Sequence, residues 1–176
     1  MTIFMNIVLI GYRGTGKSSV GKLLAERLGR PLISTDAEIV KRARLPIPDI
    51  VKQFGWDYFR DLESEICRDL ADKDNLIIDT GGGAVLRQQN VDALKANGLL
   101  FWLTAEVLTI QRRIGGDHQR PSLTGTKSFL EEIEGVLRER LPKYRAAADH
   151  IIGTDHHSLS EVADAVLAYV KALSGG

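Results

Sequence analysis

The stretch GYRGTGKSS combines three glycines, a lysine and two serines directly after the apolar run 7–10. Residues 11–18 match the phosphate-binding pattern G-x-x-x-x-G-K-S/T without a gap. In this pattern the backbone N–H groups of the turn and the positive end of the following helix surround phosphate oxygens. Lys17 is expected to reach the β- and γ-phosphates, and Ser18 to hold Mg²⁺. The sequence therefore predicts that ATP is one ligand.

Phosphate-binding loops occur in switches, motors and small-molecule kinases, so the motif alone does not choose among these classes. The chain has no Asn-Lys-x-Asp stretch for reading guanine, and 176 residues leave no room for a motor domain. A kinase that acts on a small acceptor is therefore the leading interpretation.

A kinase needs a group that orients or deprotonates the acceptor hydroxyl, and charges that fix the rest of the acceptor. Asp36 follows the predicted strand 31–34 and would point into a cleft there, although it would equally suit the N-cap of the next helix. Arg60 lies three residues before Glu63, so the two can pair on one helix face. Arg60 can also bind an anion with two nitrogens. Arg140 is a further cation near the end of a helix, where stabilising the helix dipole is its alternative role.

The elements that must position these residues are short apolar runs alternating with longer segments of helical periodicity. Apolar runs bounded by turn residues are typical of strands buried on both faces. In the first helical segment Val20 and Leu24 share one face, and Gly29 ends the pattern. The alternation predicts a mostly parallel sheet covered by helices on both sides, with ligands at the carboxyl ends of the strands. The predicted strands are 7–10, 31–34, 76–79, 99–103 and 150–153.

Length and composition indicate one globular domain. Hydrophobic residues make up 44% of the chain, and 23 basic side chains balance 23 acidic ones, which argues against nucleic-acid or membrane partners. The lone Cys67 has no partner for a disulfide or a CxxC site and is expected in the core. Since the start of the chain has no basic run or long apolar core, a cytoplasmic protein is expected. A monomer is expected because the sequence shows no exposed heptad or obvious apolar patch that would favour obligate assembly.

The segment GGDHQRPSLTGTKS, residues 115–128, resists assignment to a helix or strand. Loops of this length inside a compact domain are usually functional lids or disordered segments. We favour a lid, because the segment carries Arg120 and follows Arg112 and Arg113. A surface loop with incidental charge is the alternative.

The motifs GYRGTGKSS, TDAEI, FGWDYFRDLE, TGGGAV, RPSL and RLPKYRAAAD follow one another as in shikimate kinases, and the resemblance spans nearly the whole chain. It implies an α/β fold with three α/β/α layers, a five-stranded parallel sheet and the mobile lid of P-loop kinases. Residues 1–176 would form this single domain, with a lid at about 113–128 and acceptor-binding helices at about 36–63. The implied reaction transfers the γ-phosphate of ATP to the 3-hydroxyl of shikimate, in aromatic amino-acid biosynthesis.

The resemblance also assigns the acceptor site. Asp36 matches the aspartate that orients or deprotonates the substrate hydroxyl. Arg60 and Arg140 match the pair that holds the shikimate carboxylate, a task that suits guanidinium groups. A backbone without side chains lets the ring approach and offers N–H groups to a substrate oxygen. The glycine run matched to that role is Gly81, Gly82 and Gly83.

On the ATP side, the resemblance makes Lys17 and Arg120 catalytic together with Asp36. Arg120, with Pro121, matches the lid arginine that closes over the phosphates and stabilises charge in the transition state. Arg113 corresponds more loosely to a residue near the adenine. The loop at 155–158 lies where the family wraps the adenine, but its two histidines are atypical and we leave it out of the predicted site. The predicted ATP-binding residues are Gly14, Thr15, Gly16, Lys17, Ser18, Ser19, Arg113 and Arg120.

One departure from the family pattern concerns Mg²⁺, the expected cofactor. The family usually has Asp-x-Asp at the end of the second strand, whereas this chain has Ser34-Thr35-Asp36, so the metal surroundings are short of one negative charge. Asp79 ends the third strand, where many P-loop enzymes place a metal-supporting acid. We therefore expect Ser18 and, through water, Asp79 at the metal. The alternative is that Asp79 caps the glycine turn or pairs with a nearby base.

Two other functions compete with this interpretation. A kinase for another small hydroxylated acid, such as gluconate, would share the P-loop, lid and fold, although the two arginines and the triple glycine favour a compact carboxylated ring. A weakly catalytic regulator that binds ATP and a ligand is the second alternative, and Ser34 gives it some weight.

Overall fold

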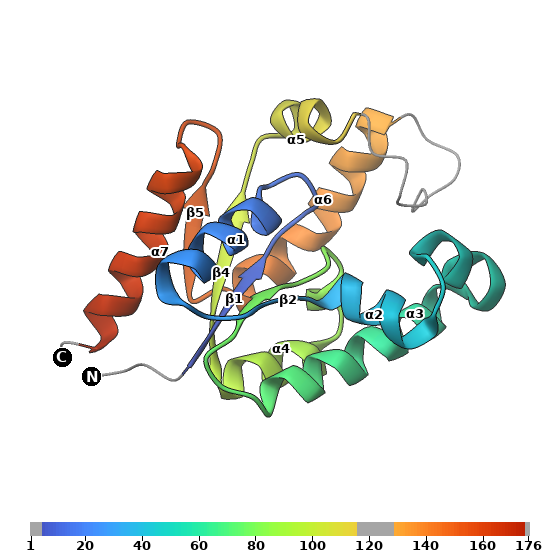
Figure 1. The fold of residues 1–176 in the computed structure, drawn as a ribbon. Coiled ribbons are helices and arrows are strands. Elements are labelled where there is room, and N and C mark those ends of the chain that lie inside the picture. Colours follow the sequence, from blue (N-terminus) through green and yellow to red (C-terminus); the bar gives the residue numbers. More distant parts are fainter. Residues whose placement is uncertain (1–4, 116–128, 175–176) are drawn as a thin grey trace.

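The computed structural model describes residues 5–115 and 129–174 (Figure 1). Helical segments separate each strand from the next along these ranges, as the sequence predicted. The strands are β1 Asn6–Ile10, β2 Leu32–Ser34, β3 Ile77–Asp79, β4 Gly98–Thr104 and β5 His150–Gly153. The helices are α1 Lys17–Leu28, α2 Thr35–Ala43, α3 Ile47–Ala71, α4 Gln88–Ala96, α5 Val107–Ile114, α6 Phe129–Ala147 and α7 Leu159–Ser174, with a short 3-10 turn, η1, at Ala84–Leu86.

The five strands form one sheet in the order β2-β3-β1-β4-β5, and every pair of neighbours is parallel. The predicted five-stranded parallel sheet is therefore confirmed. Because β3 lies between β2 and β1, Asp79 is in register with both Ser34 and Leu9. This order brings the end of β3 next to the strand that leads into the P-loop.

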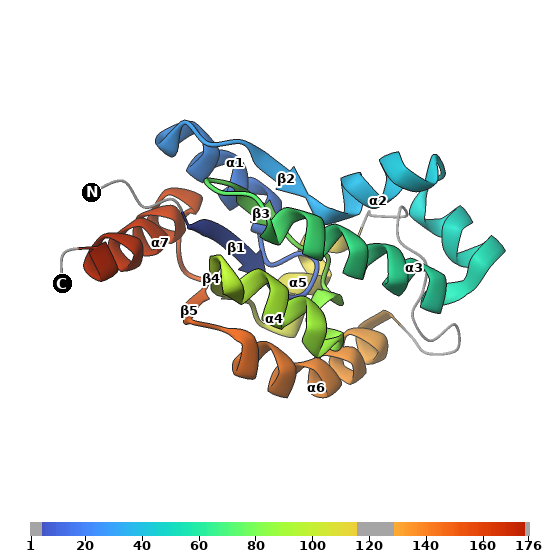
Figure 2. The ribbon, with the colours of Figure 1, turned by 90° about the horizontal axis from the view of Figure 1, so that it is seen from below.

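Helices cover both faces of the sheet (Figure 2). Side chains alternate along a strand, so Ile7 and Leu9 of β1 face α1 and α7, whereas Val8 and Ile10 face α3, α4 and α6. Both faces of the sheet are thus closed by apolar cores, which explains the uninterrupted apolar runs in the sequence. Cys67 is fully buried in the second of these cores, as predicted, and burial raises the pKa of its thiol to about 12.

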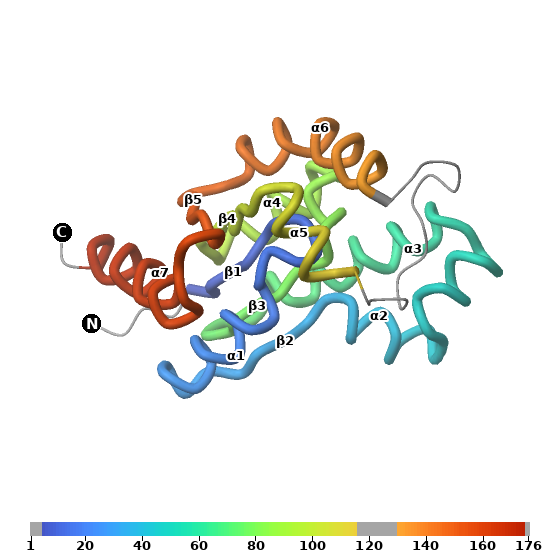
Figure 3. Tube along the Cα trace, turned by 90° about the horizontal axis from the view of Figure 1, so that it is seen from above, coloured from blue at the N-terminus to red at the C-terminus, as the bar shows by residue number. Residues whose placement is uncertain are grey.

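Helices α2 and α3 extend beyond the end of the sheet and form a lobe beside the P-loop (Figure 3). Gly55 interrupts α3 with φ 85° and ψ 170°, a conformation that glycine adopts without a steric penalty. The chain therefore turns at Gly55 and starts a new helical segment, which carries Trp56, Phe59 and Arg60. The sequence pattern had not indicated this break.

None of the helices in the described ranges is long and apolar enough to cross a membrane.

Candidate active site

The P-loop lies between β1 and α1. Gly11, Gly14 and Gly16 all have positive φ, so the turn is built from backbone conformations that other residues rarely adopt. An added side-chain carbon at Gly11 would lie 2.5 Å from the carbonyl oxygen of Leu103, so β4 also requires a glycine there. Lys17 is 7% exposed, and its Nζ donates to the carbonyl oxygens of Gly11 (2.8 Å) and Tyr12 (3.0 Å). The predicted phosphate-binding lysine is thus held over the loop by the backbone.

Two adjoining cavities surround the P-loop. One is lined by Gly14, Gly16, Ser19 and residues of α5, of α7 and of the loop between β5 and α7. The other contains Lys17, Ser18 and Asp79. Together these cavities contain all of the predicted ATP-binding residues in the described ranges. They are Gly14, Thr15, Gly16, Lys17, Ser18, Ser19 and Arg113.

Arg113 reaches the first of these cavities from the end of α5. Its guanidinium group donates to the carbonyl oxygen of Gly14 (3.1 Å) and to both the hydroxyl (3.0 Å) and the carbonyl oxygen (3.2 Å) of Thr154. His157 and Ser158 line the same cavity. Sequence reasoning left these two out because the histidines were atypical. Because ligands gather at the carboxyl ends of the strands, the position of these two residues after β5 was the signal that could have placed them in the predicted site.

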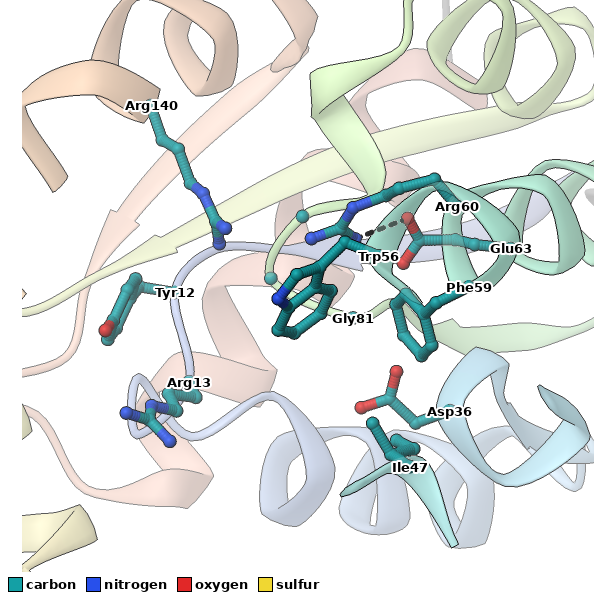
Figure 4. A pocket seen from close by; sticks show the side chains of 12 residues that line it. Tyr12, Arg13, Asp36, Ile47, Trp56, Phe59, Arg60, Glu63, Gly81 and Arg140 are labelled. Carbon is teal, nitrogen blue, oxygen red and sulfur yellow. Dashed lines mark hydrogen bonds and ion pairs between the residues drawn. The ribbon is translucent and has the colours of Figure 1, made fainter. Parts of the chain in front are cut away.

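The acceptor side is a separate pocket between the P-loop, α2, α3 and α6 (Figure 4). Arg60 and Arg140 point into it from α3 and α6, and Asp36 lies across the pocket from them (Figure 4). The complete lining is Tyr12, Arg13, Asp36, Ile47, Trp56, Phe59, Arg60, Glu63, Gly81, Gly82, Gly83 and Arg140. All six predicted acceptor residues are therefore brought together, and Tyr12, Arg13 and Ile47 are members that the sequence pattern did not indicate.

Arg60 is held by its neighbours on α3. Its Nη1 donates to Glu63 Oε1 at 2.7 Å, so the predicted pairing is confirmed. The guanidinium carbon also lies 5.4 Å from the ring centre of Trp56 and 5.2 Å from that of Phe59, within the range of cation–π attraction. These contacts fix the direction of the guanidinium group before any acceptor binds.

Glu63 is fully buried, and its second carboxylate oxygen has no hydrogen-bond partner in the described part of the chain. Burial raises the pKa of Glu63, and the nearby Asp36 acts in the same direction, whereas Arg60 and Arg140 oppose it. Both carboxylates approach Gly81 closely. A side-chain carbon built there would lie 2.7 Å from Asp36 Oδ1 and 3.1 Å from Glu63 Oε2. Gly81 therefore leaves room for two acidic groups at one wall of the pocket.

The three glycines of the run differ in the side chains and acceptors that surround them. A side-chain carbon at Gly83 would lie 2.3 Å from both terminal nitrogens of Arg60, so the guanidinium group occupies the space that a side chain would fill. The N–H of Gly81 donates to Thr35 Oγ1 at 2.9 Å, which removes it from the N–H groups expected to reach a ligand. Within the ranges described, the N–H groups of Gly82 and Gly83 have no such acceptor.

Two alternatives raised by the sequence are wrong. The N-cap of α2 is Ser34, whose hydroxyl accepts from the N–H of Ala37 at 3.2 Å, whereas Asp36 lies inside the first turn. Arg140 lies within α6 and is 7% exposed, so it does not serve a helix end at the surface. Asp36 also lines the cavity that contains Lys17 and Ser18, so it stands where the acceptor and phosphate regions meet.

A metal ion would find oxygen ligands beside the P-loop. Ser18 Oγ donates to Asp79 Oδ2 at 2.6 Å, and Ser34 lines the same cavity. No cluster of three or more potential His, Cys, Asp or Glu ligands occurs in residues 5–115 and 129–174. Mg²⁺ is commonly held by one or two protein oxygens together with phosphate oxygens and waters, so this donor set fits it. Of the lid predicted at about 113–128, residues 116–128, which include Arg120 and Pro121, lie outside the described residues.

Comparisons with known protein families agree with this arrangement. The model of the family described as "Shikimate kinase" matches residues 13–171. A shikimate kinase of Dehalococcoides mccartyi is 41% identical over 161 residues, which cover 92% of this chain and 90% of the relative. A shikimate kinase of Symbiobacterium thermophilum is 44% identical over 160 residues, covering 90% and 91%.

Solved structures give the same result for the fold. The shikimate kinase of Acinetobacter baumannii in complex with shikimate superposes with a TM-score of 0.91 at 31% identity, covering 96% of this chain and 94% of that one. The shikimate kinase of Aquifex aeolicus has a TM-score of 0.80 at 32% identity, covering 98% and 99%.

Proposed function

The chain belongs to the shikimate kinase family and is therefore an ATP-using transferase of aromatic amino-acid biosynthesis, and we propose that the pocket of Figure 4 presents the 3-hydroxyl of shikimate to the γ-phosphate. The observation that carries this proposal is the placement of Arg60 and Arg140 on one side of the pocket and Asp36 on the other. A small ring with a carboxylate at one end and hydroxyls at the other matches this distribution of charge.

The two arginines would bind the carboxylate of the acceptor. Each guanidinium group can donate two parallel hydrogen bonds to a carboxylate, and both are withdrawn from solvent, which strengthens charged hydrogen bonds. Trp56 and Phe59 hold Arg60 in place, so little side-chain freedom is lost when the acceptor binds. The N–H groups of Gly82 and Gly83 would offer further donors to the same molecule.

Asp36 would orient the acceptor hydroxyl and accept its proton as the oxygen attacks the γ-phosphorus. A carboxylate placed where the acceptor pocket meets the phosphate cavity lies beside both the acceptor hydroxyl and the phosphate that it attacks. Lys17 can turn from the carbonyl oxygens of Gly11 and Tyr12 towards the phosphates when ATP binds. Those two carbonyl bonds keep the ammonium group beside the phosphate site until ATP binds.

We propose Mg²⁺ as the cofactor, with Ser18 as its ligand and Asp79 as the acid that supports it. The hydrogen bond between these two side chains supports the assignment, because a carboxylate at 2.6 Å orients the hydroxyl and adds negative charge next to it. When bound, Mg²⁺ neutralises charge on the phosphate oxygens.

The test is a coupled assay of ADP release with shikimate, quinate and gluconate as separate acceptors, with the product identified by mass and ³¹P spectroscopy. We expect rapid turnover with shikimate and phosphorylation at its 3-hydroxyl. Turnover with gluconate but not shikimate would support a kinase of another hydroxylated acid. Binding of ATP and shikimate without phosphate transfer would support a regulator instead.

The same proposal includes a monomer as the active form. All six predicted acceptor residues lie together within a single copy of the chain, which supports this part of the proposal. Activity per chain that stays constant on dilution, with a monomer mass by analytical ultracentrifugation, is the expected result.

A further inference from the structure

Tyr144 lies one helical turn after Arg140 on α6 and connects this helix to the glycine run. It is 1% exposed, and its hydroxyl donates to the carbonyl oxygen of Gly82. Tyr144 does not line the acceptor pocket, whereas Arg140 and Gly82 both do. The tyrosine is therefore a neighbour of two acceptor-binding elements without contacting the acceptor itself.

The bond to Gly82 acts on the next residue. The carbonyl of Gly82 and the N–H of Gly83 belong to one planar peptide unit and point in opposite directions. Fixing the carbonyl oxygen on α6 therefore fixes the direction of the Gly83 N–H. Since glycine residues have the widest choice of backbone angles, this peptide unit would otherwise be the freest part of the pocket wall.

Tyr144 is itself held firmly. Its ring stacks on Trp102 of β4, with 5.6 Å between ring centres and 23° between the planes. Burial raises the pKa of Tyr144 to about 12, while the charge of Arg140 and a hydrogen bond with it act in the opposite direction. The hydroxyl is therefore protonated at neutral pH and remains a donor. Arg140 and the glycine run thus share one rigid neighbour, which is anchored on the central part of the sheet.

We propose that Tyr144 is a positioning residue for the acceptor: it holds the Gly82–Gly83 peptide and Arg140 in the relative arrangement that binds the carboxylated ring. This inference rests on the proposed acceptor pocket. It adds a residue outside that pocket which controls the affinity for the acceptor.

The test compares Tyr144→Phe with a matched control. Phenylalanine keeps the ring that stacks on Trp102 and removes only the hydroxyl. The control is Tyr169→Phe, because the Tyr169 hydroxyl also donates to a backbone carbonyl, that of Asp149, at 3.2 Å and away from the acceptor pocket. Both variants lose one hydroxyl-to-carbonyl bond, so a general effect of that loss appears in both.

We expect Tyr144→Phe to raise KM for shikimate by about fivefold to tenfold, the usual consequence of leaving a buried carbonyl unpaired at a binding site. The dissociation constant for shikimate without ATP, measured by calorimetry, should rise by the same factor, while KM for ATP changes less than about twofold. Amide hydrogen exchange at Ala84, whose N–H donates to the carbonyl oxygen of Gly81 at 3.0 Å, should become faster in this variant alone. Tyr169→Phe should leave all four measurements near wild type.

An unchanged shikimate affinity in a folded Tyr144→Phe protein would overturn the inference, as would an equal rise of KM for shikimate in Tyr169→Phe. Wild-type protein that binds no shikimate at all would instead overturn the proposed function. If Tyr144→Phe is too unstable to assay, exchange at the hydrogen-bonded amide of Ala84 in the wild type still decides. Protection that equals that of the exposed loop residues would show that the bond does not fix the peptide.

Discussion

Ser18 Oγ and Asp79 Oδ2 lie 2.6 Å apart, although 61 residues separate them in the chain. The contact joins the first residues of α1 to the end of β3, and it exists because β3 is the direct neighbour of β1 in the sheet. Asp79 is in register with Ser34 on the other side. An acid at the end of β3 can therefore reach the phosphate cavity from a position one strand away from Ser34.

Replacing Asp79 by Asn should weaken the use of Mg²⁺. Asparagine can still accept the hydrogen bond from Ser18, but it removes the negative charge. We expect the apparent affinity for Mg²⁺ to fall about tenfold, as for other residues that support a metal ligand. The measurement is the Mg²⁺ dependence of ADP binding by calorimetry, alongside that of turnover.

The double variant Ser34→Asp with Asp79→Asn provides the rescue. Aspartate is as good an N-cap as serine, so α2 should keep its start. Recovery of most of the Mg²⁺ affinity is expected, because Ser34 and Asp79 are register partners in the same cavity. Equal Mg²⁺ affinity of the wild type and Asp79→Asn would contradict a metal-supporting role for Asp79.

Gly83→Ala should impair acceptor binding. Gly83 has φ −98°, which alanine adopts freely, but the new carbon would overlap the guanidinium group of Arg60. The guanidinium group is the flexible end of the Arg60 side chain and must move away, which breaks its bond to Glu63. We expect KM for shikimate to rise at least about tenfold, the effect of losing a charged hydrogen bond. The control is Gly153→Ala, where the nearest atom would be 3.8 Å away.

The sequence predicted the sheet and the P-loop well because both depend on local patterns. Apolar runs bounded by turn residues marked all five strands, and Gly29 ends α1 with a left-handed conformation as expected. The sequence did not predict the features that depend on contacts between distant segments of the chain. The break at Gly55 and the neighbours Tyr12 and Arg13 follow from how α3 and the P-loop meet across the pocket, which no spacing within one segment indicates.

Arg60→Lys should separate geometry from charge in the acceptor site. Lysine keeps the positive charge but cannot donate two parallel hydrogen bonds, and it loses the planar contact with Trp56 and Phe59. We expect KM for shikimate to rise about tenfold or more, with KM for ATP nearly unchanged. Arg42→Lys is the matched control, because Arg42 pairs with Glu65 and Asp69 on the surface. A similar loss in both variants would contradict the assignment.

Glu63 predicts a particular dependence of stability on pH. Its pKa is raised in the folded protein, so the folded state binds a proton that the unfolded state has already released. The contribution of Glu63 is present in full below the usual glutamate pKa and is lost as the pH rises through the raised value. The free energy of unfolding should therefore decrease across this window in the wild type, and Glu63→Gln should remove that decrease.

Glu161 supplies a control of opposite sign. Its pKa is lowered, first by a hydrogen bond from the backbone of Ser158, so its stabilising effect is lost as the pH falls. Urea unfolding of the wild type, Glu63→Gln and Glu161→Gln between about pH 3 and pH 8 measures both slopes. Relative to the wild type, Glu63→Gln should gain stability as the pH rises, and Glu161→Gln should lose it. Parallel curves for the wild type and Glu63→Gln would contradict this prediction. They would mean that the buried carboxyl group of Glu63 has the same pKa in the folded and the unfolded state.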